Sequence, residues 1–113
     1  MGTTKLLAGP AALGTSAANI SQGGGGSALI YDIVKQIRVT NKGSVDATFS
    51  LYLGATGATA AGTELAKSQV VKAGTSADIF FTGLKVVSTQ YLVGLSDTAT
   101  ALTITVLGEQ YVV

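Results

Sequence analysis

The chain has 113 residues, which is enough for one domain with a modest core and too few for a second. Only 12% of the residues are charged, and seven Lys and Arg nearly balance six Asp and Glu, for a formal net charge of +1. The basic residues are scattered singly, which argues against nucleic-acid binding and against membrane attachment through a polybasic patch.

The N-terminal segment carries almost no charge. Lys5 precedes a mildly apolar stretch over residues 6–13, which Gly and Pro interrupt. A lone Lys is a weak start for a signal peptide, so we expect the segment to be retained and the protein to be made in the cytoplasm. We predict short strands at residues 5–7 and 17–21, with residues 1–8 as an N-terminal arm.

A run of four glycines, Gly23–Gly26, follows. A phosphate-binding loop would need a helix after it and a Lys with Ser or Thr at set offsets. Here a β-prone segment follows and no such Lys is present. We therefore expect a flexible hairpin tip or linker.

The strongest strand patterns occupy residues 30–40 and 46–53. The first alternates in hydrophobicity, with Lys35 as an interruption, and the second alternates without a break. The predicted inward faces consist of Ile33, Ile37 and Val39 in the first segment and Ala47, Phe49, Leu51 and Leu53 in the second. A turn at residues 41–44 predicts that the two strands form an antiparallel hairpin.

The second half of the chain repeats short β-prone runs between turns. Residues 54–63, rich in Gly, Ala and Thr, predict a mobile surface loop, and residues 64–72 fit a strand or a short helical turn. Further strands are predicted at residues 78–82, 84–87, 90–95 and 101–107, and residues 109–113 either extend the last strand or form a C-terminal contact tail.

About eight short strands in a chain of this length predict an all-β fold. We expect residues 1–113 to form a single β-sandwich domain of antiparallel strands. A jelly-roll-like strand order is preferred, and an immunoglobulin-like order is the alternative, because both need the same alternation.

The sequence carries no pattern typical of catalysis. It has no His for acid–base chemistry and no Cys, and no Ser lies in a G-x-S-x-G turn. The acidic residues lie at strand ends and turns, where they commonly cap the backbone. We therefore predict no enzymatic activity, no metal site and no cofactor.

The four Tyr residues offer a binding alternative. Tyr52 lies on the polar face of its predicted strand, which makes it the candidate exposed aromatic for a carbohydrate-binding or adhesin module. Half-buried packing is the alternative for this side chain.

The low charge also bears on assembly. A net charge near zero and a mean hydropathy of +0.48 favour self-association, so we expect a homo-oligomer rather than a monomer.

Several passages together resemble the small β-sandwich virion proteins of tailed bacteriophages, most closely capsid decoration (cement) proteins. They are the Thr- and Ala-rich opening at residues 3–18, VKQIRVTNKGSVDATFSLYL at residues 34–53, VVKAGTSADIFFTGLKV at residues 70–86 and the Thr-alternating last strand. The resemblance covers most of the chain, although none of these passages is a diagnostic motif.

The resemblance implies a location on the outer capsid surface of a virion. Such proteins bridge adjacent subunits of the major capsid protein, commonly as trimers, and termini that add strands to neighbours would suit this role. The sequence lacks the marked charge that would steer docking. A tail, neck or head-fibre component is the alternative within the structural class. The candidate protein-contact residues are Thr3, Thr4, Lys5, Leu6, Leu7, Tyr111, Val112 and Val113.

Overall fold

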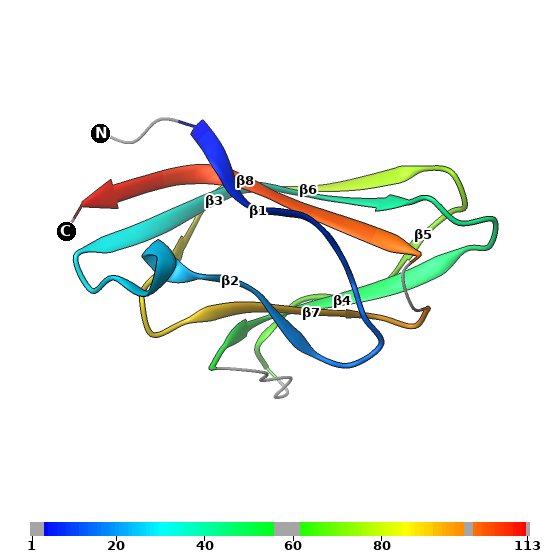
Figure 1. The fold of residues 1–113 in the computed structure, drawn as a ribbon, viewed down its shortest axis with the longest axis horizontal. Coiled ribbons are helices and arrows are strands. Elements are labelled where there is room, and N and C mark those ends of the chain that lie inside the picture. Colours follow the sequence, from blue (N-terminus) through cyan, green and yellow to red (C-terminus); the bar gives the residue numbers. More distant parts are fainter. Residues whose placement is uncertain (1–3, 56–61, 99–100, 113) are drawn as a thin grey trace.

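The computed structural model describes residues 4–55, 62–98 and 101–112 (Figure 1). Within these ranges the chain forms eight strands and one short 3-10 turn. The elements in chain order are β1 (Thr4–Ala12), β2 (Ala18–Gln22), η1 (Gly23–Gly26), β3 (Ile30–Asn41), β4 (Ala47–Gly54), β5 (Glu64–Val71), β6 (Ser76–Val86), β7 (Tyr91–Ser96) and β8 (Leu102–Val112).

The strands form two antiparallel sheets that lie one above the other in Figure 1. Sheet A has the order β1-β8-β3-β6, and sheet B has the order β2-β7-β4-β5. The predicted all-β sandwich is therefore confirmed.

The strand pairing is nested. β1 pairs with β8, β2 with β7, β3 with β6 and β4 with β5, as in one long two-stranded ribbon that has been wound up. Only β4 and β5 are consecutive strands within one sheet, and every other connection crosses between the sheets. This is the jelly-roll order, whereas an immunoglobulin sandwich places its first two strands in the same sheet.

The predicted hairpin of residues 30–40 with 46–53 is wrong. These segments belong to β3 and β4, which lie in different sheets and face each other across the core. Each strand turns one apolar face inward, and two stacked sheets bury those faces as effectively as a hairpin would.

Asn41 organises the crossing from β3 to β4. Its side chain is fully buried, and its Nδ2 donates to the carbonyl oxygens of Val45 and Val71 at 2.9 Å each. Its Oδ1 accepts the backbone N–H of Gly43 at 2.8 Å. One buried amide thereby satisfies the turn and links it to the end of β5.

The core lies between the sheets and follows the alternation of β4 and β8 as predicted. In β3 the pattern shifts, because a bulge between Val34 and Gln36 places one extra residue in the strand. Val34 therefore joins Ile37 in the core, while Ile33 is only half-buried and lies outside it. The largest fully buried apolar side chains are Phe49, Leu13, Ile37, Leu51, Leu92, Leu102 and Ile104.

The glycine run is a packed turn rather than the expected flexible tip. Gly23 and Gly24 are buried where β2 leaves sheet B and the chain enters sheet A. A Cβ on Gly23 would lie 2.1 Å from the carbonyl oxygen of Val87, and one on Gly24 would lie 2.2 Å from that of Ile30. The close approach of three backbone segments therefore requires glycine here.

Neither predicted terminal arm is free along its described length. Residues 4–8 belong to β1, which pairs with β8, and residues 109–112 are the end of β8 itself. β8 has a partner strand on each side, whereas β1 is an edge strand and among the described residues pairs with β8 alone. The tail therefore extends the last strand, one of the two outcomes that the sequence allowed.

Other boundaries differ in detail. Residues 64–71 form a strand, and the two predicted strands at residues 78–82 and 84–87 are one continuous strand, β6. Most of the predicted loop at residues 54–63 lies outside the described residues.

Candidate functional site

Two surface features stand out, one on the outer side of each sheet. The first, here called the A face, is a set of apolar and aromatic side chains on the outer side of sheet A. Its members are Leu6, Tyr31, Ile33, Phe80, Leu107 and Tyr111.

Strand register brings these residues together. Leu6 lies opposite Leu107, Leu107 opposite Gln36, and Gln36 opposite Phe80, in one row across all four strands. Directly opposed residues share a face of the sheet, and Leu107 alternates with the core residues of β8. The row ends in side chains that are 48% exposed at Leu6 and 72% exposed at Phe80.

An aromatic cluster continues this face toward the chain termini. The rings of Tyr31 and Tyr111 stack with centroids 5.5 Å apart and 15° between their planes. Lys85 Nζ lies 4.5 Å from the centroid of the Tyr31 ring, and the Tyr111 hydroxyl donates to Glu109 Oε1. Ring, cation and carboxylate thus hold each other in fixed positions on the surface.

The predicted contact residues fall in three places. Leu6 and Tyr111 belong to the A face, while Leu7 packs partly against the core and Lys5 Nζ donates to Gln110 Oε1 at 2.8 Å. Val112 is 79% exposed and, by alternation, points to the side opposite Tyr111.

The remaining contact predictions concern the chain ends. Thr4 is described only through its backbone, which pairs with Glu109. Thr3 and Val113 lie outside the described residues.

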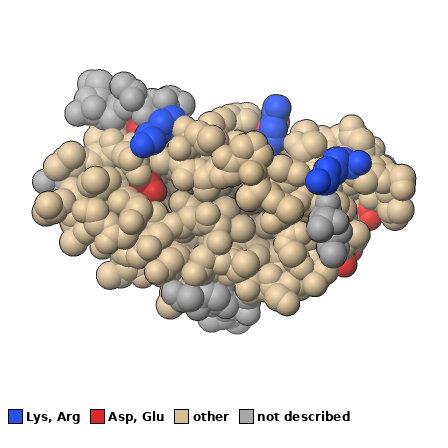
Figure 2. Space-filling view, viewed as in Figure 1, with Lys and Arg blue, Asp and Glu red and all other residues tan. Residues whose placement is uncertain are grey.

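Charge on the molecule is sparse, and Figure 2 shows a few separated charged side chains on the face in view. On sheet A, Arg38 forms a two-pronged pair with Asp78, with Nε to Oδ1 at 2.8 Å and Nη2 to Oδ2 at 3.1 Å. The Arg38 guanidinium, with Gln36, holds the pKa of the Asp78 carboxyl below its ordinary value of 3.8. The two charges of this pair neutralise each other, so the pair adds no net charge beside the apolar row.

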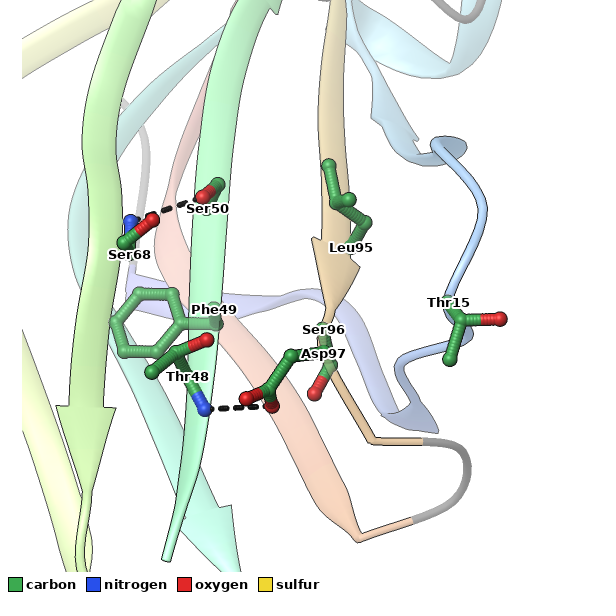
Figure 3. Close-up of a pocket in the computed structure, with 8 residues that line it drawn as sticks. All are labelled: Thr15, Thr48, Phe49, Ser50, Ser68, Leu95, Ser96 and Asp97. Atoms are coloured by element: carbon green, nitrogen blue, oxygen red, sulfur yellow. Dashed lines mark hydrogen bonds between the residues drawn. The ribbon is translucent and has the colours of Figure 1, made fainter.

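The second feature is a pocket of about 280 Å³ on the outer side of sheet B. Figure 3 shows its lining residues on β4, β5, β7 and the connection between β1 and β2. The described lining residues are Thr15, Thr48, Phe49, Ser50, Ser68, Leu95, Ser96 and Asp97. Five of these eight side chains carry a hydroxyl group, and one carries a carboxylate.

A bulge in β5 shapes one wall of the pocket. Phe49 pairs with Gln69 and Leu51 with Ala66, so Lys67 and Ser68 both oppose Ser50. Ser68 has a φ of +49°, and among the described residues it is the one non-glycine with a positive φ. Its backbone N–H donates to Ser50 Oγ at 2.9 Å, which fixes the bulge against β4.

Asp97 closes the pocket at the end of β7. Its Oδ1 accepts the backbone N–H of Thr48 at 2.8 Å, and its own N–H donates to the Thr48 carbonyl at 3.1 Å. The N–H of Thr48 holds the pKa of Asp97 below its ordinary value of 3.8. The carboxylate is therefore ionised at neutral pH and positioned by the backbone of β4.

The prediction that Tyr52 is an exposed aromatic is wrong. Tyr52 lies on the outer side of β4 as its alternation indicates, but its side chain is only 5% exposed. It pairs with the fully buried Val93 of β7, and Lys67 Nζ lies 3.5 Å from its hydroxyl and 5.9 Å from its ring centroid. Tyr52 thus packs within the outer layer of sheet B and offers no free ring to a ligand.

The pocket has little local signal in the sequence. Alternation predicts Thr48 and Ser50 on the polar face of β4, and this is the one local indication. The other lining residues come from segments far apart in the chain, and their meeting depends on the β5 bulge and on the pairing of β4 with β7.

Metal and membrane sites have no counterpart in the described ranges. Those ranges contain no group of three or more His, Cys, Asp or Glu side chains that could hold a metal ion. They also contain no helix with the length and apolar character needed to span a membrane.

Comparison with known proteins gives no family assignment. No protein-family model matches the chain, and no curated protein matches it. Among solved structures, the chain is similar to one in the structure of infectious bursal disease virus, Gx strain, at 12% sequence identity and a TM-score of 0.42. The similarity covers 97% of this chain and 30% of that chain, so the present chain spans less than a third of the other's length.

Proposed function

We propose that this protein is a structural component of a virus particle, and specifically a capsid decoration protein. In this proposal it binds the outer head surface between subunits of the major capsid protein, acts as a homotrimer and has no enzymatic activity. The observation that carries the proposal is the A face.

The composition of the A face suits a protein contact. Interfaces owe most of their binding energy to a few large side chains near the centre, with Tyr among the enriched types. Here stacked Tyr31 and Tyr111 adjoin a row that ends in Phe80, whose side chain is 72% exposed. Burial of such apolar area stabilises association by about 25 cal/mol per Å² before the entropic cost of binding is subtracted.

The fold gives this face a rigid support. Every residue of the A face lies on a strand of sheet A, and the sheet is held from behind by the core. Double-sheet jelly rolls are a recurrent architecture of viral capsid domains, although they also occur in lectins and cupins. A face supported by a stiff sandwich can bridge two subunits with little loss of its own conformational freedom.

The first experiment is a copy-number measurement. Quantitative mass spectrometry of separated head and tail fractions of the purified virion should give hundreds of copies in the heads. A few copies in the tail fraction would favour the tail, neck or head-fibre alternative. Absence from the particle would refute the virion assignment.

The second experiment tests the A face with a matched pair of variants. Phe80→Asp places a charge on the face, whereas Val45→Asp places one in the connection between β3 and β4 at almost equal exposure, 72% against 71%. Heads stripped of the protein should rebind Phe80→Asp at least about 10-fold more weakly than wild type. Val45→Asp should rebind normally, and equal loss in both variants would exclude the A face as the contact.

A further inference from the structure

The pocket on sheet B has the composition of a ligand site. Hydroxyl groups surround it, Leu95 gives it an apolar patch, and Asp97 supplies a fixed acceptor. Its volume of about 280 Å³ lies just below the roughly 300–1,000 Å³ of typical small-molecule sites. We infer that this pocket binds one neutral sugar residue of a glycan.

The hydrogen-bonding groups match a polyhydroxylated ligand. A hydroxyl group can donate and accept at once, so Thr15, Thr48, Ser50 and Ser68 can each complement a sugar hydroxyl. Ser96 is buried, and its Oγ accepts the N–H of Thr98. The ionised carboxylate of Asp97 forms the stronger, charge-assisted bonds with hydroxyl donors. Ser50 already accepts the N–H of Ser68, which leaves its own proton directed elsewhere.

The charge of the lining narrows the ligand class. The described lining residues include one carboxylate and neither Lys nor Arg. An anionic ligand such as a phosphate or an acidic sugar would meet repulsion from Asp97 with no cation to offset it. A neutral hexose or N-acetylhexosamine has no such cost.

The local backbone is built at some cost to stability, which is typical of functional sites. Ser68 adopts a left-handed conformation that disfavours residues with a Cβ, and the bulge that imposes this conformation directs the Ser68 N–H into the pocket wall. Bulges are frequent next to active sites, where they change the local direction of the chain. Without a function for the wall, a glycine or a regular strand would be the less strained choice.

The site is independent of the contact role proposed above. The pocket lies on the outer side of sheet B and the A face on the outer side of sheet A, with the core between them. A molecule held through sheet A would therefore present the pocket away from its partner. Many copies on one particle would then bind a glycan surface with high avidity from weak single sites.

The experiment is a titration of the ¹⁵N-labelled full chain, followed by amide chemical shifts. The probes are the methyl glycosides of glucose, galactose, mannose and N-acetylglucosamine, each added to about 10 mM. At least one probe should give saturable shifts centred on the amides of Thr15, Ser68 and Asp97. Shifts confined to other surfaces, or no saturable shift with any of the four, would overturn the inference.

Variants test the named groups. Asp97→Asn and Thr15→Val should each weaken the saturable response at least about 5-fold, while Thr105→Val, a hydroxyl loss on the outer side of sheet A, should leave it unchanged. Thr15 lies in an exposed connection, so its variant reports on binding even if Asp97→Asn fails to fold. Equal affinity in Thr15→Val and wild type would contradict the placement of the sugar. The measurement uses no capsid, so its result is separate from that of the virion experiments.

Discussion

At the scale of single residues, Asp32 is the most unusual group outside the two surface features. Its side chain is 2% exposed, and its Oδ1 is buried with no hydrogen-bond partner among the described residues. It lies on β3 opposite Val86 and Gln110, where the alternation directs it toward the inside of the sandwich. A buried carboxylate oxygen without a partner loses hydration that the protein does not replace.

Asp32→Asn should therefore stabilise the fold. The neutral amide has a smaller desolvation cost, so we expect the free energy of unfolding at neutral pH to rise by about 1 kcal/mol. Chemical denaturation measures the change. Asp46→Asn is the control, because that exposed carboxylate accepts the N–H of Ala73 and its loss should give no gain. A decrease for Asp32→Asn would show that the charge is needed in place.

Acid should weaken the fold through surface carboxylates whose pKa is lowered. The pKa of Asp78 is held down first by its hydrogen bond from Arg38, and that of Asp97 by the backbone N–H of Thr48. Each of these carboxyl groups has a lower pKa in the folded chain than in the unfolded chain. Its ionisation therefore stabilises the fold at pH values above the unfolded pKa, and this stabilisation is lost as the pH falls through the folded pKa.

Stability should accordingly be flat near neutrality and decline at pH values below about 4, when thermal unfolding is followed from about pH 6 to about pH 2. At neutral pH, Asp78→Asn should unfold at a lower temperature than wild type, and the two unfolding temperatures should converge in acid. A constant difference between the two at all pH values would exclude a contribution from this ionisation.

At the scale of elements, the turn η1 depends on glycine at specific positions. Gly24 and Gly25 have nearly the same φ, +59° and +66°, yet only Gly24 faces a neighbouring backbone, because a Cβ there would lie 2.2 Å from the carbonyl oxygen of Ile30. Nothing lies within 4 Å of the equivalent point on Gly25. Substitution of Gly25 therefore tests backbone strain alone, whereas substitution of Gly24 tests backbone strain together with a steric clash.

Gly25→Ala should lower the free energy of unfolding by about 1 kcal/mol, which is the penalty for a left-handed residue with a Cβ. Gly24→Ala should lower the free energy of unfolding by at least about 2 kcal/mol more, because its Cβ would push the start of β3 away from the turn. Denaturation of both variants under the same conditions tests this difference. Equal losses would mean that the turn can shift without penalty.

The elements also show what a sequence can predict. Regular alternation in β4 and β8 identifies which residues face the core, and turn residues identify most strand ends. Alternation gives the face of a strand and not its neighbour, which is why the predicted pairing of β3 with β4 is wrong. Lys35 is visible as an interruption, but only the register shows that it marks a bulge that moves Val34 inward and Ile33 outward.

The surface features are less accessible to prediction. Leu6 and Tyr111 are expected at contacts because they lie near the termini, and the pairing of β1 with β8 places both on one face. Phe80 has no local signal, since an apolar residue in a strand usually predicts burial. The burial of Tyr52 depends on Val93, which is distant in sequence.

At the scale of the whole molecule, the two surface features lie on opposite sides of the sandwich, one on the outer side of each sheet. The A face is made by all four strands of sheet A. The pocket is made by three strands of sheet B, by the connection between β1 and β2, and by Asp97 directly after β7. Because the core separates them, a substitution on one should leave the other intact when the fold is retained.

The proposed homotrimer gives a direct test at this scale. Sedimentation velocity should show a species near three times the 11.3 kDa of one chain. If the A face also joins the protomers, Phe80→Asp should shift this species toward the single-chain mass, with Val45→Asp unchanged. A wild-type protein that sediments as a monomer at all concentrations would contradict the trimer.

The nested pairing has a mechanical consequence. β1 and β8 run antiparallel with Thr4 opposite Glu109, so the first and last strands begin and end at the same edge of the molecule. Tension applied through the two chain ends would therefore break the hydrogen bonds of the β1–β8 ladder one after another. The bonds would not share the load, as they do when two strands are pulled in shear. A molecule built this way withstands force across its broad faces far better than force on its termini, and any shell that it reinforces must transmit the load through those faces.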